Sequence, residues 1–371
     1  MATIRPRDLL SESLLDRLDR LDRTADLAAG RPAELLADIA LLSDAGYLNV
    51  ALPPEFGGLG CTLRQAACGQ RRLARRAPRT ALAISAHLYW TGAAADAYRT
   101  GDESLRWILL EASRGALFAG GHGGDSGEAG GDLKFADPRS RCERTGQSYQ
   151  FADSGLLSTV TPGWDWIAVH GVHQAAAARS VIAFAGRGTG TAPAFRVART
   201  VVAGTPADIF TTSALTWGHS ILASVQYSDA RRAFDAALTA YAEAAAAAMT
   251  AADPAAPGQS RASGASAGAV AGQAAGPAEP AGPVPAASTP PPGGAGHWPV
   301  AEAGTRLDAM KARIGEVTHP WQLVQTPAPD VGGQHLIGLY AMRHEVAEGA
   351  ARVHDLISQI TGTPAPARPL V

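Results

Sequence analysis

A glycine-rich loop followed by strand-like residues interrupts an otherwise helical pattern between Leu117 and Val172. The loop reads LFAGGHGGDSGEAGGD, and the chain continues through SYQFADSGLLSTVTPGWDWIAVHG. Glycine allows positive φ and a close approach of the backbone to a ligand, and consecutive backbone N–H groups of such a loop can bind an anion. The runs that follow are short, aromatic or β-branched, and separated by Gly, Pro and Ser, which is typical of strands. The stretch therefore predicts a small sheet entered through a loop that could cradle a cofactor.

The residues before this stretch are typical of helices. Leucines and isoleucines recur at helical spacing over residues 8–47, and charged residues fill much of the opposite face. Further helices are predicted over residues 63–76, 81–98 and 103–114, with no strand signal among them. Residues 1–114 are therefore predicted to form a helical domain.

The residues after the stretch continue the sheet and then return to helix. Strand-like runs reach residue 202, so the β domain is predicted to span residues 115–210. Helix resumes at Leu215 in an Ala-rich run that ends at Pro254, and two more helices are predicted over residues 300–317 and 336–361.

Residues 254–296 consist mostly of Ala, Gly, Pro and Ser, which predicts a disordered linker inside a C-terminal helical bundle of residues 211–371. The fold class is therefore α+β, with a small antiparallel sheet between two helical domains.

Charge and cysteine content exclude several classes of protein. The formal net charge of −2 gives no electrostatic reason to expect a nucleic acid or an anionic membrane as partner. The three cysteines are odd in number and lack CxxC spacing, which argues against a disulfide framework or a zinc site. The N-terminal residues lack the apolar core of a signal peptide, and no apolar run approaches the roughly 18 residues of a membrane span. A soluble cytoplasmic protein without a metal site is expected.

Five motifs in chain order resemble the acyl-CoA dehydrogenase family of FAD flavoproteins. They are GYLNVALPPEFGGLG, FAGGHGGDSGEAGGD, SYQFADSGLLSTVTPGWDWIAVHG, ARRAFDAAL and YAMRHEVAEGAARVHDLISQITG. The resemblance implies FAD between the β domain and the C-terminal bundle, with an acyl-CoA or other acyl thioester beside it. It also implies a homo-oligomer, either a dimer or a tetramer, and an oxidoreductase of lipid metabolism.

The resemblance places the flavin contacts on the loop and the strands that follow it. The matching positions are Gly121, His122, Gly131, Asp132, Leu157 and Thr159. Asp132 and Thr159 keep the expected chemistry. Gly121 and Gly131 replace a Thr and a Ser of the family, and Leu157 replaces an aromatic residue. A Gly-rich loop alone is also the pattern of a plain surface turn, so the flanking motifs are what favour a cofactor.

The base that abstracts the proton α to a thioester is missing from its usual places. One family position for this Glu matches Gly218, and His219 follows it. An imidazole is suited to proton transfer near neutral pH, so His219 is the candidate catalytic residue. The alternative is a histidine that merely forms hydrogen bonds at the start of a helix, and His87 is expected to have such a structural role.

Three functions stay open at this point. The first is an acyl-CoA dehydrogenase that removes an α-proton and a β-hydride from an acyl thioester. The missing base motivates the second, a catalytically impaired paralogue that binds a ligand or a partner subunit. A further reason is that the family has two more strands after the run AFRV, where this chain soon enters a helix. The third is a flavin-dependent monooxygenase, because relatives with this fold use reduced flavin and oxygen.

A run of arginines lies apart from all of these motifs. Its members are Arg71, Arg72, Arg75, Arg76 and Arg79. Two interpretations are open: the run contacts a phosphate-bearing ligand, or it forms a solvated helix face, which is the more ordinary outcome.

Overall fold

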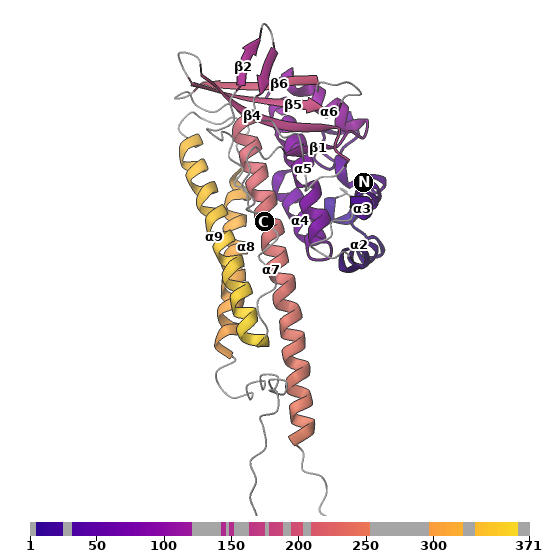
Figure 1. Ribbon diagram of the computed structural model, residues 1–371, viewed down its shortest axis with the longest axis vertical. Coiled ribbons are helices and arrows are strands. Elements are labelled where there is room, and N and C mark those ends of the chain that lie inside the picture. Colours follow the sequence, from indigo (N-terminus) through magenta and orange to yellow (C-terminus); the bar gives the residue numbers. More distant parts are fainter. Residues whose placement is uncertain are drawn as a thin grey trace, which may run out of the picture.

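The chain forms a helical body with a small sheet at one end (Figure 1). The computed structural model describes residues 5–24, 32–120, 142–145, 148–151, 163–174, 178–187, 194–202, 209–252, 297–321 and 331–362. The α+β class is confirmed, since mostly helical segments flank the sheet on both sides in the sequence. The division into three domains stays a prediction, and the predicted linker at 254–296 lies outside the described residues.

The N-terminal part is helical, as its periodicity predicts. Its α-helices are α1 (Pro6–Leu9), α2 (Glu12–Thr24), α3 (Pro32–Asp44), α4 (Leu63–Ala74), α5 (Pro78–Arg99) and α6 (Arg106–Ser113). Its short 3₁₀ turns are η1 (Tyr47–Asn49), η2 (Pro54–Phe56) and η3 (Glu103–Leu105). Thr62 begins α4 with reciprocal bonds: its hydroxyl accepts from the Gln65 N–H at 3.3 Å, and the Gln65 side chain accepts from the Thr62 N–H at 2.9 Å.

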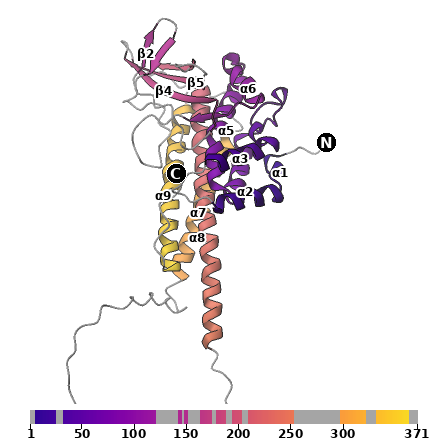
Figure 2. The same cartoon turned by 45° about the vertical axis from the view of Figure 1, so that its right-hand side comes forward.

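The sheet has the strand order β1-β4-β5-β6, and a separate two-stranded hairpin joins β2 to β3. The strands are β1 (Phe118–Gly120), β2 (Cys142–Thr145), β3 (Ser148–Phe151), β4 (Trp166–Gln174), β5 (Ala178–Gly186) and β6 (Ala194–Val202). The hairpin lies on the far side of the sheet from α5 and α7 (Figures 1 and 2).

The sheet is mixed rather than wholly antiparallel as predicted. β4, β5 and β6 pair antiparallel, but β1 pairs parallel with β4, with Phe118 opposite Trp166. The long stretch between these two strands gives the chain room to return to the start of the sheet, which a parallel pair requires.

The described residues of the C-terminal part form three long helices. They are α7 (Ile209–Ala252), α8 (His297–Trp321) and α9 (Val331–Thr361). Both predicted helices after the linker are confirmed, and α7 begins before the predicted Leu215. α7 packs against α9 on one side and against α4 and α5 on another, so it joins the C-terminal part to the N-terminal part. Its distal end extends past α8 and α9 (Figure 2).

One carboxylate ties α5, α7 and α8 together. Oδ2 of Asp96 on α5 accepts hydrogen bonds from Ser213 Oγ at 2.5 Å and Trp217 Nε1 at 2.8 Å on α7. The same oxygen accepts from Trp321 Nε1, at the end of α8, at 3.1 Å. Its second oxygen accepts from Arg99 at 2.7 Å, one turn along α5. Two indole N–H groups thus find their acceptor in a single side chain that is only 17 % exposed.

Replacing Asp96 with Ala should destabilise the protein by about 3 kcal/mol, because two largely buried indole N–H groups lose their acceptor. Urea unfolding followed by tryptophan fluorescence measures the loss. Glu243→Ala, on the exposed part of α7, is the matched control and should change little. Equal stability of the two variants would show that the Asp96 bonds do not hold the helices together.

Gly92 lets α5 and α7 approach closely. A Cβ built at Gly92 would lie 2.4 Å from ring atoms of Trp217, closer than real contacts allow. Gly92→Ala should therefore destabilise the protein by about 2 kcal/mol, even though Ala is the better helix former.

Gly304→Ala on α8 is the matched control for this substitution, because a Cβ there meets nothing within 4 Å. It should raise stability by about 0.5–1 kcal/mol. Thermal denaturation of the two variants beside the original protein measures both signs. A Gly92→Ala protein as stable as Gly304→Ala would disprove the close approach.

Candidate functional site

The predicted cofactor loop leaves the sheet from the end of β1. Gly120 is the last residue of this strand, and a Cβ at that position would lie 2.8 Å from the Tyr89 hydroxyl of α5. Burial raises the pKa of Tyr89, so its phenol stays protonated. The backbone therefore passes directly over a buried side chain of α5, and a residue larger than Gly at 120 would push the strand away from the helix.

His87 fixes the start of the same strand. Its Nε2 lies 3.0 Å from the Leu48 carbonyl, and its Nδ1 lies 3.3 Å from the Phe118 backbone N–H. The carbonyl can only accept and the N–H can only donate, so the ring is neutral with its proton on Nε2. Burial lowers the pKa of His87 to about 4, although the bond to the Leu48 carbonyl opposes this effect. The expected structural role of His87 is confirmed.

Aromatic side chains fill the space between the sheet and the helices. On the sheet they are Phe118, Trp166 and Phe184. Trp107 of α6 packs edge-on against Trp166, with ring centroids 5.1 Å apart, and Trp90 of α5 packs in the same way against Phe184 at 5.0 Å. Trp90 also stacks on Phe210, in the first turn of α7, at 5.9 Å. This face of the sheet is therefore occupied by the protein's own rings.

The sheet-proximal ends of α7, α8 and α9 form a second cluster. His335 on α9 stacks on Trp321 of α8, with centroids 4.9 Å apart, and its Nε2 lies 2.9 Å from Thr216 Oγ1 on α7. The Thr216 hydroxyl donates its only proton to the Thr212 carbonyl at 2.7 Å. His335 Nε2–H must then be the donor to Thr216, which places the proton on Nε2. Burial lowers the pKa of His335.

His219 lies one turn after Thr216, on the side of α7 that faces α9. Its side chain is fully buried, and its ring meets Tyr340 of α9 edge-on, with centroids 5.2 Å apart. Tyr340 itself is 50 % exposed, so the phenol separates the imidazole from solvent. The structure thus forms two pairs between α7 and α9, one of His219 with Tyr340 and one of Thr216 with His335. Such groups can hold or pass a proton.

Most of the predicted site lies outside the described residues. These positions are Gly121, His122, Gly131, Asp132, Leu157 and Thr159. His219 is the one predicted site residue that the structure describes, so its placement relative to the others stays a prediction. Gly218 is buried within α7, at the position where a carboxylate was sought.

Sequence reasoning missed the polar contacts that join α7 to its neighbours. Asp96, Trp321 and His335 come from three helices far apart in the chain, and helical periodicity treats each as a residue on one helix face. Trp217 carried a weak signal, since tryptophan in an Ala-rich helix needs a partner for its indole N–H.

The sequence predicts neither a metal site nor a membrane-spanning helix. Among the described residues, no three His, Cys, Asp or Glu side chains gather where a metal ion could bind. The described helices include none with both the length and the apolar character for crossing a membrane.

The fold, unlike the sequence, matches known proteins. No family model and no curated protein matches the sequence. The nitrososynthase from Micromonospora carbonacea var. africana is 16% identical, with a TM-score of 0.64 over 96% of this chain and 86% of that one. KijD3 in complex with FMN and a dTDP-linked amino keto sugar is 16% identical, with a TM-score of 0.68 over 96% of this chain and 83% of that one.

A dibenzothiophene monooxygenase from a Paenibacillus species is 14% identical, with a TM-score of 0.60 over 96% of this chain and 87% of that one. At such identities the likeness establishes a shared fold. The predicted acyl-CoA dehydrogenase-like fold is thereby confirmed.

The neutral state of His87 predicts that acid destabilises the fold. The unfolded chain binds a proton near the ordinary pKa of 6.5, whereas the folded chain resists it down to about 4. Stability should therefore be complete above pH 6.5 and fall as the pH drops toward 4, by a total of about 3 kcal/mol from this residue. His335 contributes in the same direction.

Urea unfolding at a series of pH values measures this slope, and His87→Gln should reduce it. His344→Gln is the matched control, because the His344 side chain is 71% exposed and its removal should leave the slope unchanged. An unaltered slope in His87→Gln would disprove the assignment.

Proposed function

We propose that this protein is a flavin-dependent monooxygenase, an oxidoreductase that uses reduced flavin and molecular oxygen. The observation that supports it most is a fold shared over 96% of the chain with a structure that contains FMN. Further support comes from the names of other structures with this fold, which include a methanesulfinate monooxygenase and a dibenzothiophene monooxygenase.

Two observations support a flavin at the glycine-rich loop. β1 ends at Gly120, directly before the loop, and a Cβ at Gly120 would lie 2.8 Å from the Tyr89 hydroxyl. The protein's own buried rings occupy the face of the sheet next to α5, so we place the flavin at the loop instead. The loop's backbone N–H groups, Asp132 and Thr159 would hold the phosphate and the ring.

When bound, a flavin supplies the redox chemistry, and the protein supplies position, shielding from water and proton transfer. His219 is the proposed proton-transfer residue, since its imidazole is fully buried against Tyr340 of α9. A buried group of this kind would act away from bulk water, where electrostatic interactions are stronger.

The acyl-CoA dehydrogenase alternative requires a strong, positioned base for a weakly acidic α-proton. The matching position is Gly218, which has no side chain, and the neighbouring His219 is a weaker choice than a carboxylate for this task. Oxygen-dependent chemistry on reduced flavin does not need that base. We therefore place monooxygenation ahead of acyl thioester oxidation, and ahead of a catalytically impaired paralogue.

The proposal includes a flavin cofactor without a choice between FMN and FAD. FMN is the flavin in two structures with this fold, whereas the family resemblance implied FAD. A homo-oligomer and a cytoplasmic location stay predictions.

Flavin binding is the first test of the proposal. Quenching of flavin fluorescence, with FMN and FAD titrated separately, should show saturable binding of at least one. Asp132→Ala and Thr159→Ala should each weaken the affinity about tenfold, because each removes one hydrogen bond to the flavin. Glu243→Ala is the control and should bind like the original protein.

Oxygen consumption separates the three functions. With chemically reduced flavin, the proposal expects protein-dependent oxygen uptake that a productive substrate couples to its oxygenation. Bleaching of bound flavin by an acyl-CoA would favour the dehydrogenase instead. Binding of neither FMN nor FAD would contradict both and leave the impaired paralogue.

A further inference from the structure

A charged groove lies between α2, α4 and α7, away from the proposed flavin site. Its volume is about 460 Å³, within the range of small-molecule sites. The lining side chains are Glu12, Leu15, Arg72, Arg75, Arg76, Arg232 and Asp235. Four guanidinium groups therefore face two carboxylates within one concavity. Three of the four arginines belong to the run on α4 that the sequence left open between a phosphate contact and a solvated face.

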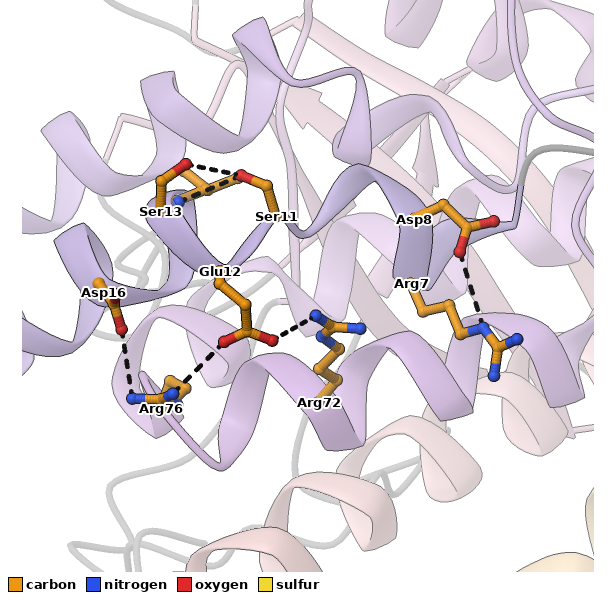
Figure 3. A network of polar contacts seen from close by, with 9 residues as sticks. Arg7, Asp8, Ser11, Glu12, Ser13, Asp16, Arg72 and Arg76 are labelled. Carbon is orange, nitrogen blue, oxygen red and sulfur yellow. Dashed lines mark hydrogen bonds and ion pairs between the residues drawn. The ribbon is translucent and has the colours of Figure 1, made fainter.

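The arginines of the groove are oriented by carboxylates on two other helices. Arg72 donates to Glu12 of α2 at 2.7 Å, and Arg76 reaches the other oxygen of Glu12 at 3.4 Å (Figure 3). Across the groove, Arg75 donates to Asp235 of α7 at 2.6 Å. These side chains bridge three helices, so the arginine run is more than a solvated helix face.

These ion pairs engage only some of the guanidinium N–H groups of Arg72 and Arg75. Among the described contacts, Arg72 and Arg75 each donate through Nη2 alone, and a guanidinium carries five N–H groups. Arg76 is the exception, since Asp16 at 3.4 Å and Asp19 at 3.8 Å also surround it. Arg72 and Arg75 therefore retain N–H groups for an anion in the groove.

The carboxylate partners can be displaced at low cost. Glu12 is 67% exposed and Asp235 is 33% exposed, and exposed ion pairs contribute little to stability. Phosphate oxygens match the planar guanidinium fork as well as a carboxylate does and carry more charge. A phosphate group that enters the groove can therefore replace Glu12 and Asp235 as the acceptor from Arg72 and Arg75.

We propose that this groove binds a soluble small molecule through a phosphate or diphosphate group, with Arg72, Arg75 and Arg232 as its main contacts. The site is separate from the proposed flavin site, since Arg232 lies roughly 24 Å further along α7 than Thr216, at about 1.5 Å per residue. It does not depend on the proposed function, because a failure to bind flavin leaves it unaffected.

Isothermal titration of the full-length protein with inorganic diphosphate tests the proposal, and sodium chloride of matched ionic strength is the screening control. Saturable binding with a Kd below about 1 mM is expected. Arg72→Gln/Arg75→Gln should weaken it about tenfold or more. Arg114→Ala removes an exposed arginine that directly follows α6 and does not line the groove, so this variant should bind like the original protein.

Removing the competing carboxylates separates a binding site from a purely structural network. Glu12→Gln/Asp235→Asn should bind diphosphate several-fold more tightly under the proposal, because amide oxygens replace the charged carboxylates as competitors for the arginine N–H groups. If the arginines serve only to hold the helices together, the same variant would lose thermal stability without any gain in affinity. That result, or binding that Arg72→Gln/Arg75→Gln leaves intact, would overturn the proposal.

Vesicles that contain phosphatidic acid form a second arm. A protein that sediments with these vesicles and shows no response to diphosphate would place the phosphate on a lipid and overturn the soluble ligand. Response to diphosphate with no retention on vesicles is the expected pattern.

Discussion

The structure depends on the carboxylate of Asp96. Two tryptophans from different helices, and a serine one turn from the first, all donate to one oxygen of this side chain. Hydrogen bonds to a carboxylate are stronger than those to a neutral acceptor. The bonds from the two indole N–H groups therefore fix the positions of rings that are otherwise apolar. α7 and the end of α8 are thus set relative to α5, and α9 packs on this frame through the stacking of His335 on Trp321 and the bond between His335 and Thr216.

The sheet is positioned by a different kind of contact. Interlocked rings from α5 and α6 hold β4 and β5, while His87 links β1 to η1 through one bond to each backbone, a pair that only a neutral imidazole can make. The glycine-rich loop therefore leaves from a strand whose position is fixed by packing and by one protonation state. The start of the loop is thereby held at a defined place, which a cofactor-binding loop would require.

Helical periodicity predicted most of the helices and the order of helix, sheet and helix, because each of those elements buries one face that its own sequence displays. β1 was not predicted as a strand, since its three residues carry no alternation and its parallel partner is far away in the sequence. Asp96 was missed for a related reason: its partners lie on other helices, and a single Asp on a helix reads as an exposed residue. The arginine run was recognised, but its carboxylate partners on α2 and α7 could be found only in three dimensions.

One family position for the catalytic Glu matches Gly218, and the surroundings of this glycine bear on which base the site could hold. A carboxylate there would lie in a buried stretch of α7 and would need donors to offset its desolvation. The next residue, His219, packs edge-on against the Tyr340 ring, and the Thr216 hydroxyl already donates to the Thr212 carbonyl. A carboxylate at position 218 would therefore depend on donors from elsewhere. The proposed monooxygenase reaction does not need a carboxylate at this position, since reduced flavin and oxygen would supply its driving force.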